Sequence, residues 1–96
     1  MINKKIVYRP HLIRRIKERG FPGNYPRKIY RESEYNFYDK ATKHYIAVSK
    51  LKHGGKLRKL AISYDIIDGR VEIITIHPVS EKDFKSKIRS KRWQKK

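Results

Sequence analysis

A histidine and two arginines recur at every fourth position near the start of the chain, within residues 8–21. If this stretch is a helix, its residues turn by about 100° each, and His11, Arg15 and Arg19 form one ridge. Histidine is the side chain that exchanges a proton near pH 7, and arginine is a permanent cation whose planar guanidinium binds phosphate. A proton-transfer group beside two phosphate-binding cations predicts RNA cleavage as the chemistry.

Metal-free RNA cleavage needs a base for the 2′-OH proton, an acid for the leaving 5′-oxygen, and cations that stabilise the charged transition state. His11 and His77 are the best pair for the proton steps, because each lies at an end of a predicted element, where side chains can converge on a groove. Arg15 and Arg19 suit the charge-stabilising role. The predicted catalytic residues are therefore His11, Arg15, His77 and Arg19.

Each of these residues has a structural alternative. His11 could cap its helix or lie on the surface, and His77 could be a partly buried residue that ends its strand. Arg19 could cap the C-terminal end of the helix beside Gly20. Arg15 could form an ion pair with a nearby carboxylate. The acidic residues considered for that pair are Glu18, Asp65 and Glu72.

The charge balance of the chain is strongly basic. Its 96 residues contain 26 Lys and Arg against 9 Asp and Glu, which gives a formal net charge of +17. Such a bias predicts an anionic partner: a nucleic acid, a membrane surface or an acidic protein. Charge alone does not choose among the three.

The absence of cysteine excludes disulfides and thiolate metal sites and fits a reducing, cytoplasmic setting. The N-terminal residues lack the apolar run of a signal peptide, and no stretch approaches the roughly 18 apolar residues of a membrane span. We therefore expect a cytoplasmic protein with no membrane partner.

Neither a metal nor another cofactor is expected. The spacing of the four histidines matches no zinc motif, and the acidic residues are scattered without a clear ligand pair. The sequence also lacks a glycine-rich nucleotide loop and a serine nucleophile elbow.

Further basic residues, together with one tryptophan, are candidates for holding the nucleic-acid backbone. Trp93 has two open roles: it could anchor the last helix, or it could stack on a base. The predicted nucleic-acid-binding residues are Arg14, Lys56, Arg58, Arg70, Lys91, Arg92 and Trp93.

The elements that must position these side chains begin with a short strand at Lys5–Tyr8. Pro10 suits the first turn of a helix and Gly20 suits its C-terminal cap, which predicts a helix over Pro10–Arg19. A second short helix is predicted over 26–33. The residues of the first helix expected to face the core are Leu12, Ile13 and Ile16.

The middle of the chain alternates apolar and polar residues, with turn residues between the runs, which predicts strands over 34–38, 44–51, 57–66 and 70–77. Strict alternation in the last strand would place Val71, Ile73, Thr75 and His77 on one face. A last basic helix is predicted over 81–93, with residues 94–96 frayed.

These elements predict a single α+β domain over 1–96, in the order β-α-α-β-β-β-β-α. The helices are expected to pack against one face of a twisted, mainly antiparallel sheet. The other face, or a groove at the sheet edge, is left for a ligand.

The chain contains five motif pieces: His11, Arg15, Arg19-Gly20-Phe21, Gly69-Arg70 and Ile73-Ile74-Thr75-Ile76-His77. With these motifs it resembles the RelE/ParE toxin superfamily, and more narrowly its small members whose first helix begins with a histidine. The resemblance implies a RelE-like fold and the toxin of a toxin–antitoxin pair. Many relatives are metal-independent ribonucleases, whereas the ParE branch inhibits DNA gyrase. The best-known ribonuclease members use Lys, Arg and a late Tyr, but no tyrosine follows Tyr64 here.

Three functions are therefore considered. The first is a metal-independent endoribonuclease that is the toxin of such a pair, with RNA (ribosome-bound mRNA as one form) and an acidic antitoxin as partners. The second is a non-catalytic RNA- or DNA-binding protein. The third is a ParE-like toxin that acts by protein contact.

Overall fold

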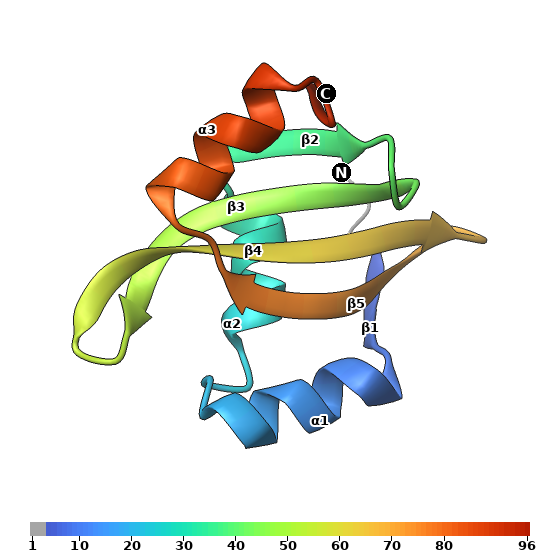
Figure 1. Ribbon diagram of the computed structural model, residues 1–96. Helices are drawn as coiled ribbons and strands as arrows, with labels where there is room; N and C mark the ends of the chain where they lie inside the picture. Colours follow the sequence, from blue (N-terminus) through green and yellow to red (C-terminus); the bar gives the residue numbers. More distant parts are fainter. Residues whose placement is uncertain (1–3) are drawn as a thin grey trace.

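The computed structural model describes residues 4–96, which form three helices and one six-stranded sheet (Figure 1). The strands lie in the order β1-β5-β4-β3-β2-β6; β1 and β5 are parallel, and the other neighbours are antiparallel. The predicted α+β class is confirmed. None of the helices in this part of the chain is long and apolar enough to cross a membrane. The elements are β1 (Lys5–Tyr8), α1 (Pro10–Arg19), α2 (Tyr25–Glu32), β2 (Tyr35–Asp39), β3 (His44–His53), β4 (Lys56–Ile67), β5 (Arg70–Pro78), α3 (Glu81–Arg89) and β6 (Trp93–Lys95).

The predicted antiparallel meander is formed by β2, β3, β4 and β5. Its two tightest turns have the residue types that the hairpin geometry requires. Gly54 and Gly55 join β3 to β4, and Asp68 and Gly69 join β4 to β5, all four with positive φ. Two successive residues with positive φ give a turn whose twist matches that of the strands.

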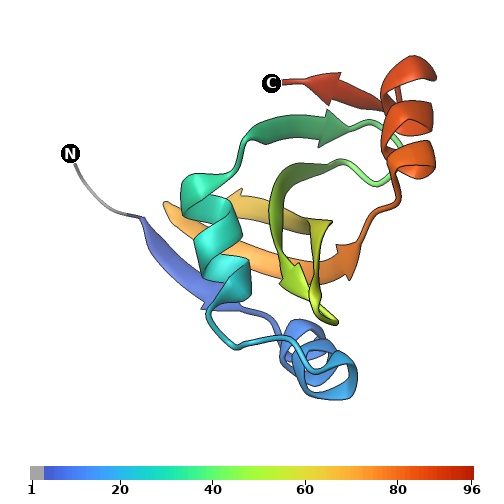
Figure 2. The same cartoon turned by 90° about the vertical axis from the view of Figure 1, so that its left-hand side faces the viewer.

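Helices cover both faces of the sheet, whereas the sequence predicted helices on one face only. α1 and α2 lie on one side and α3 lies on the other (Figures 1 and 2). The reason is that the β2–β3 half of the sheet is apolar on both faces. The larger core, beneath α1 and α2, contains Leu12, Phe21, Ile29, Ala47, Leu60, Ile62, Tyr64, Val71, Ile73 and Ile76. The smaller core, beneath α3, contains Phe37, Ile46, Val48, Ala61, Val79, Phe84 and Trp93.

The first helix has the predicted bounds. Pro10 occupies its first turn, and Gly20 ends it in the left-handed conformation at φ 69°. Leu12 is fully buried and Ile16 packs partly against the same core. Ile13, however, is 46% exposed, so the prediction that it faces the core was wrong. Leu12 and Ile16 are almost in line at a spacing of four, whereas Ile13 is turned by about 100° from Leu12.

Strand β5 contains a bulge that breaks the predicted alternation. Thr75 pairs with Ser63 and Ile73 pairs with the next residue, Tyr64, so Ile74 is the extra residue. A bulge shifts the side chains beyond it by one position. Ile73 and Ile76 therefore enter the same core, while Thr75 turns to the opposite face. The prediction that Val71, Ile73, Thr75 and His77 share one face was wrong.

The C-terminal segment is a shorter helix followed by a strand. Ser80 caps α3 by accepting a hydrogen bond from the Asp83 N–H over 3.1 Å, and the helix ends at Arg89 instead of the predicted residue 93. Lys91 has positive φ and reverses the chain. Gln94, predicted to be frayed, then pairs with Tyr38 as part of β6. Burial of Trp93 explains this ending, because the indole leaves the helix to reach the core beneath α3.

Candidate functional site

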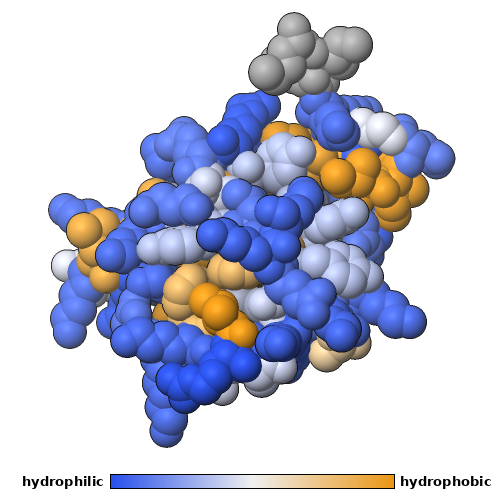
Figure 3. Space-filling model, turned by 90° about the horizontal axis from the view of Figure 1, so that it is seen from above, coloured by the Kyte–Doolittle hydropathy of each residue, from blue (hydrophilic) through white to orange (hydrophobic). Residues whose placement is uncertain are grey.

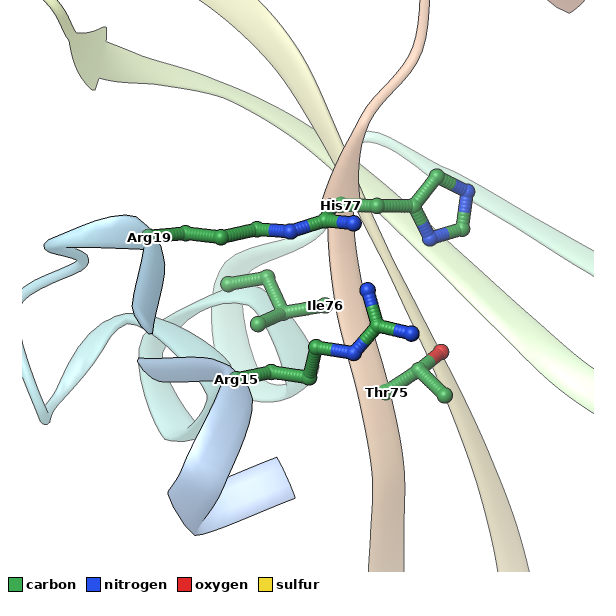
Figure 4. A pocket seen from close by; sticks show the side chains of 5 residues that line it. All are labelled: Arg15, Arg19, Thr75, Ile76 and His77. Atoms are coloured by element: carbon green, nitrogen blue, oxygen red, sulfur yellow. The ribbon is translucent and has the colours of Figure 1, made fainter. Parts of the chain in front are cut away.

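An open pocket of about 410 Å³ lies where α1 meets β5. Its lining consists of Arg15, Arg19, Thr75, Ile76 and His77. The two arginine side chains extend from α1 across β5 toward Thr75 and His77 (Figure 4). The structure therefore brings together three of the four predicted catalytic residues.

The pocket lies on a part of β5 that has no neighbouring strand on its outer side in the described chain. β1 pairs with β5 only as far as Tyr8 and Ile73, and the chain then turns into α1. Leu12 anchors α1 against the core beside β5. Arg15 and Arg19 are one turn apart, which separates them by about 6 Å along the helix. The helix thus presents two guanidinium groups to the unpaired edge.

The two arginines of the pocket form no ion pair within residues 4–96. Two of the carboxylates that were alternative partners for Arg15 are held elsewhere. Glu72 accepts hydrogen bonds from Arg9 Nε at 3.0 Å and from Arg70 Nη2 at 2.7 Å. These hydrogen bonds, that from Arg70 first, lower the pKa of Glu72. The negative charge of Glu72 is therefore paired with Arg9 and Arg70, which lie outside the pocket.

Asp65, the second alternative partner, belongs to the same polar group on β4. Its Oδ1 lies 2.7 Å from His44 Nδ1, and its Oδ2 lies 3.7 Å from Arg9 Nη2. Arg9 therefore bridges Asp65 and Glu72. Because this group contains its own cations, the positive charges of the pocket remain available for an anionic ligand.

His77 is the titratable group of the pocket. Burial lowers the pKa of His77 below its usual 6.5, and the positive charges of Lys87, Arg19 and Arg15 lower it further. The imidazole is consequently neutral at pH 7, which is the state that can accept a proton. Lys87 comes from α3, so cations on both sides of the sheet act on this one side chain.

Thr75 and Ile76 are pocket residues that the sequence did not identify. Ile76 is part of the larger core and forms an apolar wall. Thr75 Oγ1 lies 2.7 Å from Ser63 Oγ on the adjacent strand. A threonine in a β-rich run is normally read as a strand former. The bulge at Ile74 turns Thr75 away from the larger core, onto the same face as His77 two positions further on.

His11, the remaining predicted catalytic residue, does not line the pocket. It is exposed at the second position of α1, one turn before Arg15. The rise of the helix places it about 6 Å from Arg15 along the axis. His11, Arg15 and Arg19 therefore lie along one ridge of α1 as predicted, but His11 is at the end of the ridge that is farther from the pocket.

The predicted nucleic-acid-binding residues are spread over several elements. Arg14, Lys56 and Lys91 are exposed. Arg58 lines a second open pocket of about 380 Å³, beside the ion pair of the buried Lys59 with the exposed Glu81. Hydrophilic residues dominate the face seen from above Figure 1, and hydrophobic residues form small separate patches there (Figure 3).

Three of these residues have side-chain hydrogen-bond partners in the fold. Arg70 bonds Glu72, and Arg92 Nε donates to Asp39 Oδ1 over 3.2 Å. Trp93 is only 3% exposed; its ring stacks on Phe37 with centroids 5.4 Å apart, and its Nε1 donates to Asp39 Oδ2 over 3.1 Å. Of the two roles left open for Trp93, the structure shows the anchoring one.

Within residues 4–96, no three His, Asp or Glu side chains come close enough together to hold a metal ion. The arrangement can instead bind an anion and accept a proton. Comparison with known proteins gives no match to a family model, a curated protein or a solved structure.

Proposed function

We propose that the protein is a metal-independent endoribonuclease in which the RNA's own 2′-OH attacks the adjacent phosphate. The observation that carries this proposal is the pocket itself. Two guanidinium groups without carboxylate partners in the described chain face a neutral imidazole across one open cavity. Phosphate binding and proton removal are the two functions that such a cavity combines.

His77 is the proposed base. Its neutral imidazole takes the proton of the 2′-OH, and the oxygen then attacks phosphorus. Arg15 and Arg19 stabilise the extra negative charge of the pentacoordinate transition state. The incoming phosphate also offsets the neighbouring cations, so an imidazolium forms on His77 more readily when RNA is bound.

His11 is the proposed acid for the leaving 5′-oxygen. It is exposed at the far end of the ridge that carries both arginines. A nucleotide held at Arg15 would extend along this ridge toward it. The reaction leaves a cyclic phosphate on one product and a 5′-hydroxyl on the other.

We extend the proposal to a toxin of a RelE-like toxin–antitoxin module. Its support is the motif His11, Arg15, Arg19-Gly20-Phe21 together with the net charge of +17. An acidic antitoxin and RNA, including ribosome-bound mRNA, are the proposed partners. Both are anionic surfaces that would compete for the same cations.

A non-catalytic RNA- or DNA-binding protein is the second candidate. The observation that favours it is the large number of exposed basic residues outside the pocket, such as Arg14, Lys56 and Lys91. Such a protein needs cations but no titrating imidazole. The two candidates therefore differ in whether His77 matters.

The test is cleavage of a single-stranded RNA oligonucleotide in EDTA, with a DNA oligonucleotide of the same sequence as control. We expect cleavage of RNA only, because DNA lacks the attacking 2′-OH. The Arg15→Ala/Arg19→Ala variant should cleave at least 10²-fold more slowly, the usual effect of removing transition-state charge stabilisation. The matched control is Arg14→Ala/Lys17→Ala, which removes the same charge from exposed positions of α1.

Equal activity of the two double variants would contradict the pocket assignment. If the wild-type protein leaves free and ribosome-bound RNA intact, the nuclease proposal fails. Salt-dependent binding would then favour the nucleic-acid-binding candidate. Inhibition of DNA gyrase supercoiling without nucleic-acid cleavage would favour the ParE-like alternative.

A further inference from the structure

We propose that Thr75 is a phosphate-binding residue of the pocket and that Ser63 orients its hydroxyl toward the ligand. This inference deepens the proposed function, on whose pocket it rests. The ligand class is a phosphate ester of RNA, bound through its non-bridging oxygens. Thr75 touches the ligand in this arrangement, whereas Ser63 acts only through Thr75 and is a positioning residue.

The bulge in β5 is the first step of the argument. It leaves Ile74 unpaired and places Thr75 opposite Ser63 and His77 opposite Ala61. Thr75 and His77 are two positions apart beyond the bulge, so they point to the same face of the sheet. Both line the pocket. Bulges commonly re-aim side chains beside functional sites, and this one turns both Thr75 and His77 away from the larger core that Ile73 and Ile76 enter.

The direction of the hydrogen bond between the two hydroxyls is the second step. Ser63 Oγ and Thr75 Oγ1 lie 2.7 Å apart, so one donates to the other. Ser63 is 8% exposed, and Thr75 Oγ1 is the side-chain partner of its hydroxyl within residues 4–96. If Thr75 donated, the buried Ser63 hydrogen would have no acceptor there, which is unfavourable. Ser63 is therefore the donor, and the Thr75 hydrogen is free to point into the pocket.

The charge of the pocket explains why a hydroxyl is useful at this position. Arg15 and Arg19 already contribute to the lowered pKa of His77. A third cation here would oppose protonation of the imidazole during the reaction. A hydroxyl donates a hydrogen bond to a phosphate oxygen without adding charge, so it holds the ligand and leaves His77 free to accept the proton.

Binding of a ribonucleoside 3′-monophosphate, measured by calorimetry at low ionic strength, tests this inference without requiring cleavage. Thr75→Val keeps the shape of the side chain and removes the donor. We expect it to weaken binding by roughly tenfold, the usual size for one hydrogen bond to a charged group. Thr75→Ser should restore most of the affinity. Thr42→Val, at an exposed turn position, is the matched control and should bind as the wild type does.

The role of Ser63 is tested by a double-mutant cycle. Ser63→Ala should weaken binding in the wild-type background, because the Thr75 hydroxyl loses its orientation. The same change should have no effect in the Thr75→Val background. An equal loss in both backgrounds would contradict a positioning role for Ser63, and an unchanged affinity of Thr75→Val would contradict the whole inference.

A measurement on the unmutated protein covers the case in which a variant does not fold. Titration with the 3′-monophosphate should shift the NMR signal of the Thr75 methyl group with the same Kd as the Nε signals of Arg15 and Arg19. Failure of the wild type to bind the nucleotide, or an unmoved Thr75 signal, would overturn the inference. Nucleotide binding through Thr75 without RNA cleavage would instead overturn only the nuclease proposal.

Discussion

His77 combines a lowered pKa with a position beside the guanidinium groups of Arg15 and Arg19, which form no ion pair with the residues that the structure describes. Burial is the largest cause of the lowered pKa of His77, and the cations that would bind a phosphate lower it further. A bound phosphate would weaken that effect and raise the pKa of His77. The bound RNA phosphate therefore makes it easier for His77 to accept the proton of the RNA 2′-OH.

His77→Gln should lower RNA cleavage by the ~10²–10⁴-fold typical of a lost proton-transfer group, while RNA affinity stays nearly unchanged. His11→Gln should have a comparable effect if the exposed histidine is the acid. Single-turnover kinetics and binding anisotropy of both variants check these expectations. A fully active His11→Gln beside an inactive His77→Gln would remove His11 from the mechanism and leave the pocket assignment intact.

The pKa of His77 should lie below 6.5 in the free protein and rise in the Arg15→Ala/Arg19→Ala variant. NMR titration of the imidazole signals measures both values. The rise should be partial, because burial is the larger cause of the shift and Lys87 remains. In the Arg14→Ala/Lys17→Ala control, the pKa of His77 should stay closer to its wild-type value.

The same shift links protonation to folding. The unfolded chain binds a proton at His77 near pH 6.5, whereas the folded chain binds it only at lower pH. His77 therefore reduces stability progressively as pH falls from 6.5 toward the folded pKa, and it contributes nothing above that window. Urea denaturation between pH 5 and 7.5 should show a smaller decline for His77→Gln than for the wild type, and equal slopes would contradict the burial of the imidazole.

Strand β6 is held at the edge of the sheet by Asp39. This buried carboxylate accepts hydrogen bonds from the Ala41 and Thr42 N–H groups, from Arg92 and from Trp93. Burial by itself raises the pKa of Asp39, but these bonds, led by that from Arg92, outweigh it and lower the pKa. One side chain thus fixes both the turn after β2 and the last strand.

Trp93→Ala should destabilise the fold by about 3–5 kcal/mol, the usual range for deleting a large buried aromatic side chain. It should leave RNA affinity unchanged under conditions where the variant is folded. Urea denaturation and binding at low temperature measure the two effects separately. A stable variant with weakened RNA binding would show that the indole stacks on a base.

Elements whose ends are set by local residues were predictable from the sequence. Pro10 and Gly20 define α1, and Asp68-Gly69 defines the turn before β5. The ridge of Arg15 and Arg19 followed directly from the helical period. The structure brings both arginines together with His77 in one pocket, whereas His11, which the sequence analysis paired with His77, lies outside it. The catalytic roles of these residues stay predictions.

Features that depend on contacts between distant segments were not predictable. The bulge at Ile74 arises because two apolar residues, Ile73 and Ile76, both enter the larger core, which strict alternation cannot satisfy. The early end of α3 depends on Trp93 reaching Asp39 and Phe37 on the neighbouring strand β2. The residues after Arg89 include no glycine or proline that would end a helix, so the sequence gives no local sign of that contact.

At the scale of the whole molecule, a net charge of +17 dominates interactions with nucleic acids. Most of the 26 Lys and Arg residues cannot be neutralised within the chain, because it has only 9 acidic residues. Long-range attraction should therefore bring RNA to the surface, while the pocket residues act on it once it is bound.

RNA affinity should fall steeply with salt, with a log–log slope of about −0.7 for each phosphate contacted on a single strand. Fluorescence anisotropy over a salt series measures the slope. The Arg15→Ala/Arg19→Ala and Arg14→Ala/Lys17→Ala variants should reduce the magnitude of this slope by similar amounts, although only the first should slow cleavage at least 10²-fold. A flat salt response would contradict the electrostatic part of the proposal.

The parallel pairing of β1 with β5 also affects when the pocket forms during synthesis. Lys5 pairs with Arg70, so β1 finds its strand neighbour only after the whole meander has been made. Closing so long a loop is slow, whereas the hairpins of β2–β5 form between neighbouring segments. We therefore expect β1 and α1 to dock late, so that they stay undocked on the nascent chain until β5 has been synthesised. The proposed nuclease would thus be inactive on the ribosome that makes it until synthesis has passed β5.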